Sequence, residues 1–212
     1  MADFDQDLHF RSAPERGELY RILVRLLTYP DENVTRAVQT GELDHAIQNL
    51  LKSVPHGLTW RCGGLWDDNV KLQSEFMRLF ELSVKGTPCV LYGGVYADNR
   101  RAVMEELLRY YRHFGLSVDG APEKDLPDSI PTVLEFMQFL CVMESRAESP
   151  EIATVPRKVQ KDLLERHLTR WSPLLRERMS HMNPVRVYRD TIEFLDAWCQ
   201  AELNQLAVNR IH

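Results

Sequence analysis

Two side chains in this chain are placed where they could transfer protons. Asp128 lies in the turn Leu126–Ser129, directly before an apolar segment with helical periodicity. His167 is the one histidine of seven that falls on the inward face of a predicted helix. A carboxylate and an imidazole can act together as general acid and base, so a small helical enzyme using Asp128 and His167 is one interpretation. The favoured interpretation of His167 is a hydrogen-bonded core residue.

The other spacings do not match a catalytic or metal-binding motif. The chain has no Gly-x-Gly-x-x-Gly, Walker, His-Glu-x-x-His or Gly-x-Ser-x-Gly sequence. Glu165 and His167 are one position too close for the Glu-x-x-His pair of di-iron proteins. We therefore expect no metal ion and no cofactor. Four widely spaced cysteines form no Cys-x-x-Cys pair, which predicts reduced thiols in a reducing compartment: Cys62, Cys89, Cys141 and Cys199. We expect the last two to be core residues.

The charge balance restricts the possible partners. A net charge of −5 argues against a general nucleic-acid binder, which needs a basic surface to displace counterions from phosphate. A helical transcription regulator is a further alternative, but Glu105 and Glu106 interrupt its candidate basic helix face at Arg100, Arg101, Arg109 and Arg112. The acidic N-terminal segment lacks the features of a signal peptide, and no apolar run could cross a bilayer. We expect a soluble cytoplasmic protein without stable membrane insertion.

The apolar pattern is helical almost throughout and predicts an all-α fold of seven to nine helices. We expect one globular domain over residues 1–212, with a flexible N-terminus at 1–17 and long linkers at 55–68, 85–99 and 115–128, the last being a hinge. Helix caps are expected at Asp31, at Asp67 or Asp68, and at Asp98 or Asn99, and a glycine stop at Gly115. Because no second strand exists to pair with it, the β-branched segment 85–99 is predicted to be loop and helical turn.

Two further boundaries follow from the same pattern. The apolar stripe that begins at Ile130 is expected to stop at Glu144, the next position on that helix face. A polar linker at 145–156 is then expected to precede a helix over 157–171.

Large aromatic side chains are concentrated in the predicted loops. Trp60, Trp66, Tyr92 and Tyr96 lie in or beside segments rich in glycine. Two interpretations are open: these rings fill gaps between helices, or they line a groove that holds an apolar or helical segment of a partner.

The motifs taken in order resemble the TorD/DmsD/NarJ family of chaperones, which assist maturation of molybdenum enzymes of the dimethyl sulfoxide reductase family. The resemblance covers roughly residues 18–200. It rests on five short motifs in a fixed order. They are a Leu-Phe helix end (Leu79-Phe80), an aromatic-x-x-x-Gly-Leu helix end (Tyr111–Leu116), a Leu-Pro-Asp-x-Ile-Pro turn (Leu126–Pro131), a Leu-Glu-Phe triplet (Leu134–Phe136) and a late His-Leu-x-x-Trp-x-Pro (His167, Trp171 and Pro173).

The resemblance implies a binding protein, not an enzyme. Its partner would be the apo catalytic, molybdenum-binding subunit of a client, held until the cofactor is inserted, together with the client's twin-arginine leader. The sequence departs from the family pattern at two places. Ser129 stands where the family has histidine, so the resemblance does not carry over the roles of that histidine, including nucleotide binding. The Tyr92–Tyr96 loop lacks the acid found in the nitrate-reductase branch. This pattern is similar to the branch that serves type II enzymes such as chlorate and selenate reductases. The chain is expected to be a monomer or a dimer.

For the client site we expect an apolar wall and a polar anchor. The wall consists of one helix end and the following loop: Phe76, Leu79, Phe80, Tyr92 and Tyr96. The anchor is Asp128, beside Leu126, Pro127 and Ser129 of the same turn and Glu135 of the next helix. The alternative is that Asp128 only caps that helix; a capping role is expected in either case.

Overall fold

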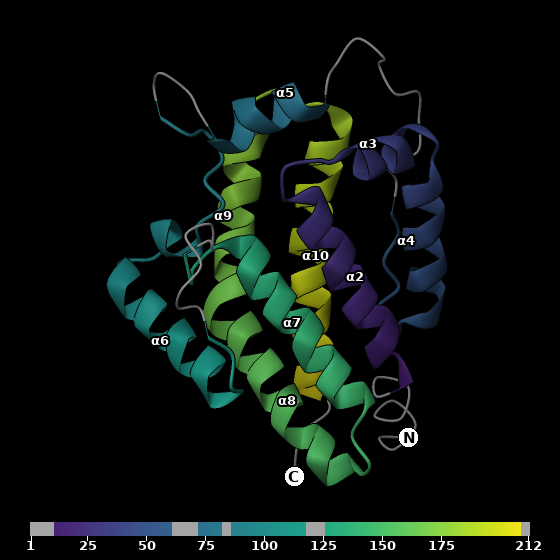
Figure 1. Cartoon of the computed structure of the whole chain (residues 1–212), viewed down its shortest axis with the longest axis vertical. Helices are drawn as coiled ribbons and strands as arrows, with labels where there is room; N and C mark the ends of the chain where they lie inside the picture. Colours follow the sequence, from purple (N-terminus) through teal and green to yellow (C-terminus); the bar gives the residue numbers. More distant parts are fainter. Residues whose placement is uncertain (1–10, 61–71, 82–85, 118–125, 209–212) are drawn as a thin grey trace.

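A computed structural model describes residues 11–60, 72–81, 86–117 and 126–208 of the chain (Figure 1). Within these ranges the regular elements are helices, and the β-type pairing consists of an isolated bridge between Tyr92 and Ser129. The prediction of an all-α fold is confirmed. Trp66, Cys62 and the expected cap at Asp67 or Asp68 lie outside the described residues. None of the described helices combines the length and the apolar character that crossing a bilayer requires.

The N-terminal helices are α2 (Ala13–Leu26), α3 (Glu32–Gln39) and α4 (Glu42–Ser53). Asp31 caps α3 as predicted, because its carboxylate accepts a hydrogen bond from the Val34 N–H at 2.7 Å. Helix α2 starts inside the segment expected to be flexible, and both Arg16 and Gly17 are buried. The first turn of α2 therefore packs into the protein.

Helix α7 (Ile130–Ser145) is the centre of the molecule and packs mainly against α2. Gly17 makes the close approach possible, since a Cβ there would lie 3.2 Å from the Cβ of Cys141. The predicted end of the apolar stripe at Glu144 is wrong. Glu144 is fully buried and hydrogen-bonds Arg16, with 3.0 Å between Oε2 and Nη1.

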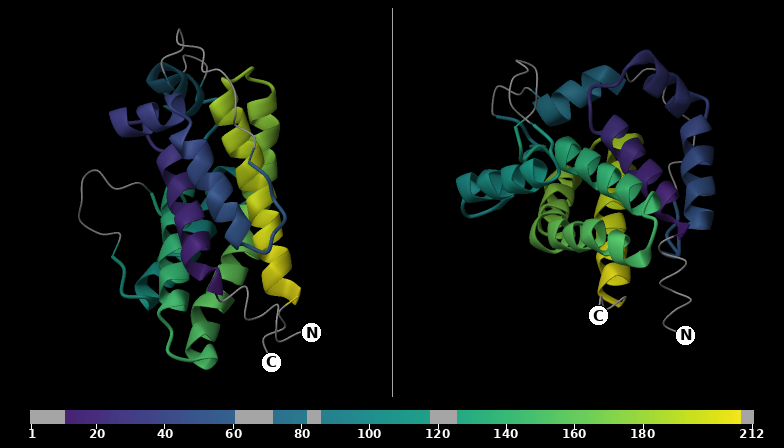
Figure 2. Two further views of the ribbon diagram at one scale, coloured as in Figure 1. Left: turned by 90° about the vertical axis from the view of Figure 1, so that its right-hand side faces the viewer. Right: turned by 60° about the horizontal axis from the view of Figure 1, so that its bottom comes forward.

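The C-terminal half is one long bent helical run followed by a long helix. Helix α8 (Pro150–Leu163) continues through a π-helical turn (Leu164–Leu168) into α9 (Thr169–Ser180). The expected linker at 145–156 is therefore wrong in its second half: Ser149 caps α8, its hydroxyl lying 3.4 Å from the Ile152 N–H. Helix α10 (Arg186–Val208) packs against α9, α8 and α2, so the first and the last described helices are in contact (Figures 1 and 2).

Helix α6 (Arg100–His113) lies to one side of the other helices (Figure 2). Its predicted ends are confirmed. Asn99 caps it through the Ala102 N–H at 3.1 Å, and Gly115, with φ +70°, ends it. The Leu116 N–H bonds the Tyr111 carbonyl at 2.9 Å, as in a Schellman stop.

Short helical turns connect α6 to the rest of the fold. Helix α5 (Leu72–Phe76) continues into a π-helical turn (Met77–Glu81), and a 3-10 turn (Gly93–Tyr96) precedes α6. The described part of segment 85–99 is thus loop and helical turn, as predicted.

Candidate partner-binding site

The Asp128 junction, defined as residues 91–94 and 127–130, joins the turn before α6 to the start of α7. The Gly93 N–H donates to the Asp128 carbonyl at 2.7 Å, and the Ile130 N–H donates to the Leu91 carbonyl at 2.8 Å. Tyr92 and Ser129 pair between these two bonds as an antiparallel bridge. Two loops that are far apart in sequence are therefore joined through their main chains.

The Asp128 side chain strengthens the same connection. Its carboxylate is fully buried, and Oδ2 accepts hydrogen bonds from Arg100 Nε at 2.8 Å and from the Gly94 N–H at 3.2 Å. Oδ1 accepts from Arg100 Nη2 at 3.2 Å. The Arg100 guanidinium also lies over the Tyr92 ring, 5.3 Å from its centroid. The hydrogen bond to Asp128 raises the pKa of Arg100, so the guanidinium stays protonated.

The expectation that Asp128 caps α7 is wrong. Ser129 occupies the N-cap position, and its side chain makes no capping hydrogen bond. The Ser129 N–H closes a turn onto the Leu126 carbonyl at 2.9 Å. The Asp128 carboxylate meets the glycine turn across the junction instead of the first N–H groups of α7.

The Gly93-Gly94 pair permits close packing at this point. A Cβ on Gly93 would lie 2.2 Å from the ring of Trp171, and a Cβ on Gly94 would lie 2.7 Å from Asp128 Oδ2. Glycine is required here because a side chain would displace either the tryptophan or the carboxylate.

Two tyrosines fix the surroundings of the junction. The Tyr111 hydroxyl donates to the Pro127 carbonyl at 2.9 Å, and the Tyr96 hydroxyl donates to the Val90 carbonyl at 2.7 Å. Burial raises the pKa of Tyr96 to about 12, although the nearby Arg178 guanidinium opposes the shift. Tyr96 therefore stays protonated and able to donate this hydrogen bond.

The predicted apolar wall divides into two layers. Phe76, Leu79 and Phe80 are buried, and both phenylalanine rings contact Tyr188, at centroid distances of 6.1 and 5.4 Å. Tyr92 and Tyr96 are half-buried. The first group belongs to the core below the surface, and only the second has ring area that a partner could touch in this conformation.

Two apolar side chains next to the junction are exposed. Leu126 is 44% exposed and Val95, at the tip of the 3-10 turn, is 40% exposed. Of the other predicted residues, Pro127 and Ser129 are buried and Glu135 is exposed on α7. The sequence reasoning missed Val95, Trp171 and the pairing role of Arg100. Only the glycine pair hinted at such close packing.

His167 is a core residue with an unusual environment. It is 2% exposed and lies against Trp171, with ring centroids 5.0 Å apart. Its Nε2 is 3.5 Å from Glu106 Oε2, and neither ring nitrogen has a hydrogen-bond partner among the described residues. The core interpretation is confirmed, but the expected hydrogen bond is wrong. The contacts described for Asp128 are to Arg100 and Gly94, not to His167.

Comparison with known proteins identifies a matching family and three related chaperones. Residues 42–177 match the model of the family described as "Nitrate reductase delta subunit". The chain is 27% identical over 201 residues to the perchlorate reductase assembly chaperone protein of Dechloromonas aromatica, covering 90% of this chain and 89% of the relative. It is 26% identical to the selenate reductase assembly chaperone protein of Thauera selenatis and 27% identical to the chlorate reductase assembly chaperone protein of Ideonella dechloratans, each over 76% of this chain and 74% of the relative.

The family match begins at the start of α4 and includes the whole Asp128 junction and most of α9. It includes all the motifs on which the resemblance to the molybdoenzyme maturation chaperones rests. The chain belongs to the nitrate reductase delta subunit family, within the TorD/DmsD/NarJ group of chaperones.

Proposed function

We propose that this protein is a cytoplasmic assembly chaperone for a type II enzyme of the dimethyl sulfoxide reductase family. It binds the apo catalytic subunit, keeps it competent for molybdenum cofactor insertion, and also binds its twin-arginine leader before export. The observation that carries this proposal is the similarity over 90% of the chain to a perchlorate reductase assembly chaperone. The two relatives named for selenate and chlorate reductases support the same class of client.

The proposed activity is binding without catalysis. The described contacts of Asp128 and His167 favour it, because the carboxylate already accepts hydrogen bonds from Arg100 and Gly94 and the imidazole is buried against Trp171. A general acid or base must reach the proton that it transfers. We assign both residues to positioning the fold.

The contact surface that we propose is the exposed side of the Asp128 junction. Val95 and Leu126 present apolar side chains there, beside the half-buried rings of Tyr92 and Tyr96. The ion pair of Asp128 holds the two loops together, so a client would meet a rigid surface and little ordering entropy would be lost on binding. In this proposal Phe76, Leu79 and Phe80 support the surface from below, and Glu135, exposed on α7, meets a basic residue of the client.

Affinity purification of the tagged protein from its native host, followed by mass spectrometry, tests the function. We expect a large molybdopterin-binding catalytic subunit, enriched when the cells lack molybdate and the subunit stays in its apo form. Failure to recover such a subunit under either condition would contradict the chaperone assignment.

A pair of double variants tests the surface. Val95→Ser/Leu126→Ser should lose the client while its melting temperature stays within about 2 °C of wild type, because exposed apolar side chains contribute little to stability. Ile152→Ser/Val155→Ser on α8 is the matched control, since these side chains are 56% and 50% exposed. Equal client recovery by both variants would show that the client contacts another surface.

A further inference from the structure

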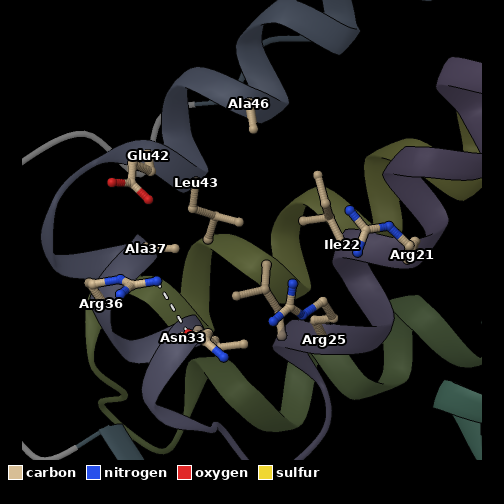
Figure 3. Close-up of a pocket in the computed structure, with 11 residues that line it drawn as sticks. Arg21, Ile22, Arg25, Asn33, Arg36, Ala37, Glu42, Leu43 and Ala46 are labelled. Carbon is tan, nitrogen blue, oxygen red and sulfur yellow. Dashed lines mark hydrogen bonds between the residues drawn. The ribbon is translucent and has the colours of Figure 1, made fainter.

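A second concave surface lies on the other side of α2 from α7, at the N-terminal helices. This α2–α4 groove has a volume of about 390 Å³ and is lined by residues of α2, α3 and α4 (Figure 3). Its floor is apolar, with Ile22 from α2, Ala37 from α3, and Leu43 and Ala46 from α4 (Figure 3). It shares no lining residue with the Asp128 junction.

Three arginines surround this floor. Arg21 and Arg25 are one turn apart on α2, and Arg36 extends from α3 (Figure 3). Glu42 is the one acidic side chain that lines the groove. All three arginines precede residue 42, where the match to the family model begins. The groove lining therefore carries more arginine than carboxylate, within a chain whose net charge is −5.

The arginines are only partly neutralised by neighbouring side chains. Arg21 is paired with Glu18, with 2.6 Å between Nε and Oε1. The nearest carboxylate oxygen described for Arg25 belongs to Asp31, at 3.9 Å, and the Arg36 guanidinium donates to the amide oxygen of Asn33 at 3.2 Å. Arg25 and Arg36 are both exposed. Guanidinium groups suit carboxylates, which they bind through two parallel hydrogen bonds.

We propose that the α2–α4 groove binds an acidic amphipathic segment of the client's catalytic subunit. Apolar side chains of that segment would lie on Leu43 and Ala46, and its carboxylates would pair with Arg25 and Arg36. An amphipathic helix can lay its apolar face in such a groove and direct the carboxylates of its other face toward Arg25 and Arg36. The same charge repels an Arg-Arg leader, so this groove recognises the subunit itself. This inference rests on the proposed chaperone function and adds a second recognition surface to it.

The test uses two designed 16-residue helical peptides with leucine on one face. One carries glutamate on the other face, and its matched counterpart carries lysine. Fluorescence anisotropy with the full chain should show binding of the glutamate peptide, weakened between about 50 and 500 mM salt because the pairs are exposed. The lysine peptide should bind at least about tenfold more weakly.

Two kinds of variant locate the binding. Arg25→Glu/Arg36→Glu should weaken binding of the glutamate peptide by at least about tenfold, because like charges then face each other. Ala46→Trp should weaken it as well, by filling the groove from an exposed position on α4. The matched controls are Arg112→Glu, another exposed arginine in a last helical turn, and Ala197→Trp, another exposed alanine on a helix. Both controls should bind like wild type.

Several results would overturn the inference. Equal binding of both peptides, or binding unaffected by Arg25→Glu/Arg36→Glu and by Ala46→Trp, would show that the groove does not select an acidic segment. Loss of self-association in the Arg25→Glu/Arg36→Glu variant during sedimentation velocity, without loss of peptide binding, would assign the groove to a second copy of the chain. If the client is recovered from the host but the glutamate peptide does not bind, the groove inference fails while the chaperone function stands.

Discussion

The Arg100 guanidinium binds the buried Asp128 carboxylate through two hydrogen bonds, of 2.8 and 3.2 Å, and thereby joins the first turn of α6 to the start of α7. The two residues are 28 positions apart, and the main-chain bonds of Gly93 and Ile130 join the same two loops. This connection ties α6, which lies to one side of the other helices (Figure 1), to the central helix α7, whose Phe136 ring also contacts Tyr111 of α6 at a centroid distance of 5.0 Å.

Removing the Asp128 carboxylate should destabilise the protein. Asp128→Ala leaves the Gly94 N–H and the Arg100 guanidinium without their acceptor, and we expect a loss of about 2–4 kcal/mol in the free energy of unfolding. Asp128→Asn keeps an acceptor for the Gly94 N–H and should lose less of the free energy of unfolding. Urea unfolding in a double-mutant cycle with Arg100→Ala should give a coupling energy of at least about 1 kcal/mol. Additive effects would mean that the ion pair contributes nothing.

A methyl group at Gly93 should disrupt the packing of the same junction. The added Cβ would lie 2.2 Å from the Trp171 ring, so the ring or the turn must move. We expect Gly93→Ala to lose about 2–3 kcal/mol of stability, as overpacking does. In a Trp171→Phe background, where the smaller ring leaves space, the further cost of Gly93→Ala should fall. An unchanged cost would show that the backbone conformation at Gly93, not the contact with Trp171, matters.

Arg16 is the centre of a fully buried ionic network that joins α2, α7 and α10. It pairs with Glu144 at 3.0 Å and with Glu202 at 2.9 Å, and Glu144 also accepts from Arg157 at 2.6 Å. Arg16→Met would leave two buried carboxylates short of a cation, which typically costs about 3–5 kcal/mol. The melting temperature should fall by roughly 10 °C.

The control for this prediction is Arg101→Met on α6. The side chain of Arg101 is 88% exposed, and its pair with Glu105 spans one helical turn. Such surface pairs contribute less than about 1 kcal/mol. Differential scanning calorimetry gives the melting temperatures. A similar fall for Arg16→Met and Arg101→Met would contradict a central role of the buried network.

The buried imidazole of His167 should make stability depend on pH. Burial, helped by Arg166 and Arg170, lowers the pKa of His167 to about 4, even though Glu106 lies nearby. In the unfolded chain the pKa of this histidine is about 6.5, so below that pH the unfolded chain binds more protons than the folded one. The stabilisation is therefore complete above pH 6.5 and is lost as the pH drops toward 4. Between pH 7 and pH 5 the loss from this group is about 2 kcal/mol.

Urea unfolding of wild type and His167→Gln over this pH range provides the measurement. The variant should lose distinctly less stability between pH 7 and pH 5, whatever its stability at pH 7. Identical pH profiles would show that the imidazole titrates normally in the folded protein. Glu75 does not interfere, since hydrogen bonds from Arg78 and from the Val185 N–H lower its pKa and move its titration to more acidic values.

The sequence alone determined the features that depend on neighbours within a few positions. The all-α class, the caps at Asp31 and Asn99 and the stop at Gly115 were all predicted, because each depends on hydrogen bonds spanning at most five residues. The family motifs could also be recognised, since they are short stretches of sequence in a fixed order. Helical periodicity also identified the core face of α7 over most of its length.

Only the tertiary structure decided where the polar side chains find their partners. Glu144 ended an apolar stripe in the sequence, yet it is buried because Arg16, 128 residues away, neutralises it. Asp128 stood at a helix start and was expected to cap it, yet its carboxylate binds Arg100 and Gly94 across a junction of two loops. Local pattern predicts burial from side-chain polarity, whereas the burial of a charge depends on a distant counter-charge, and only the packing of the helices brings the two together.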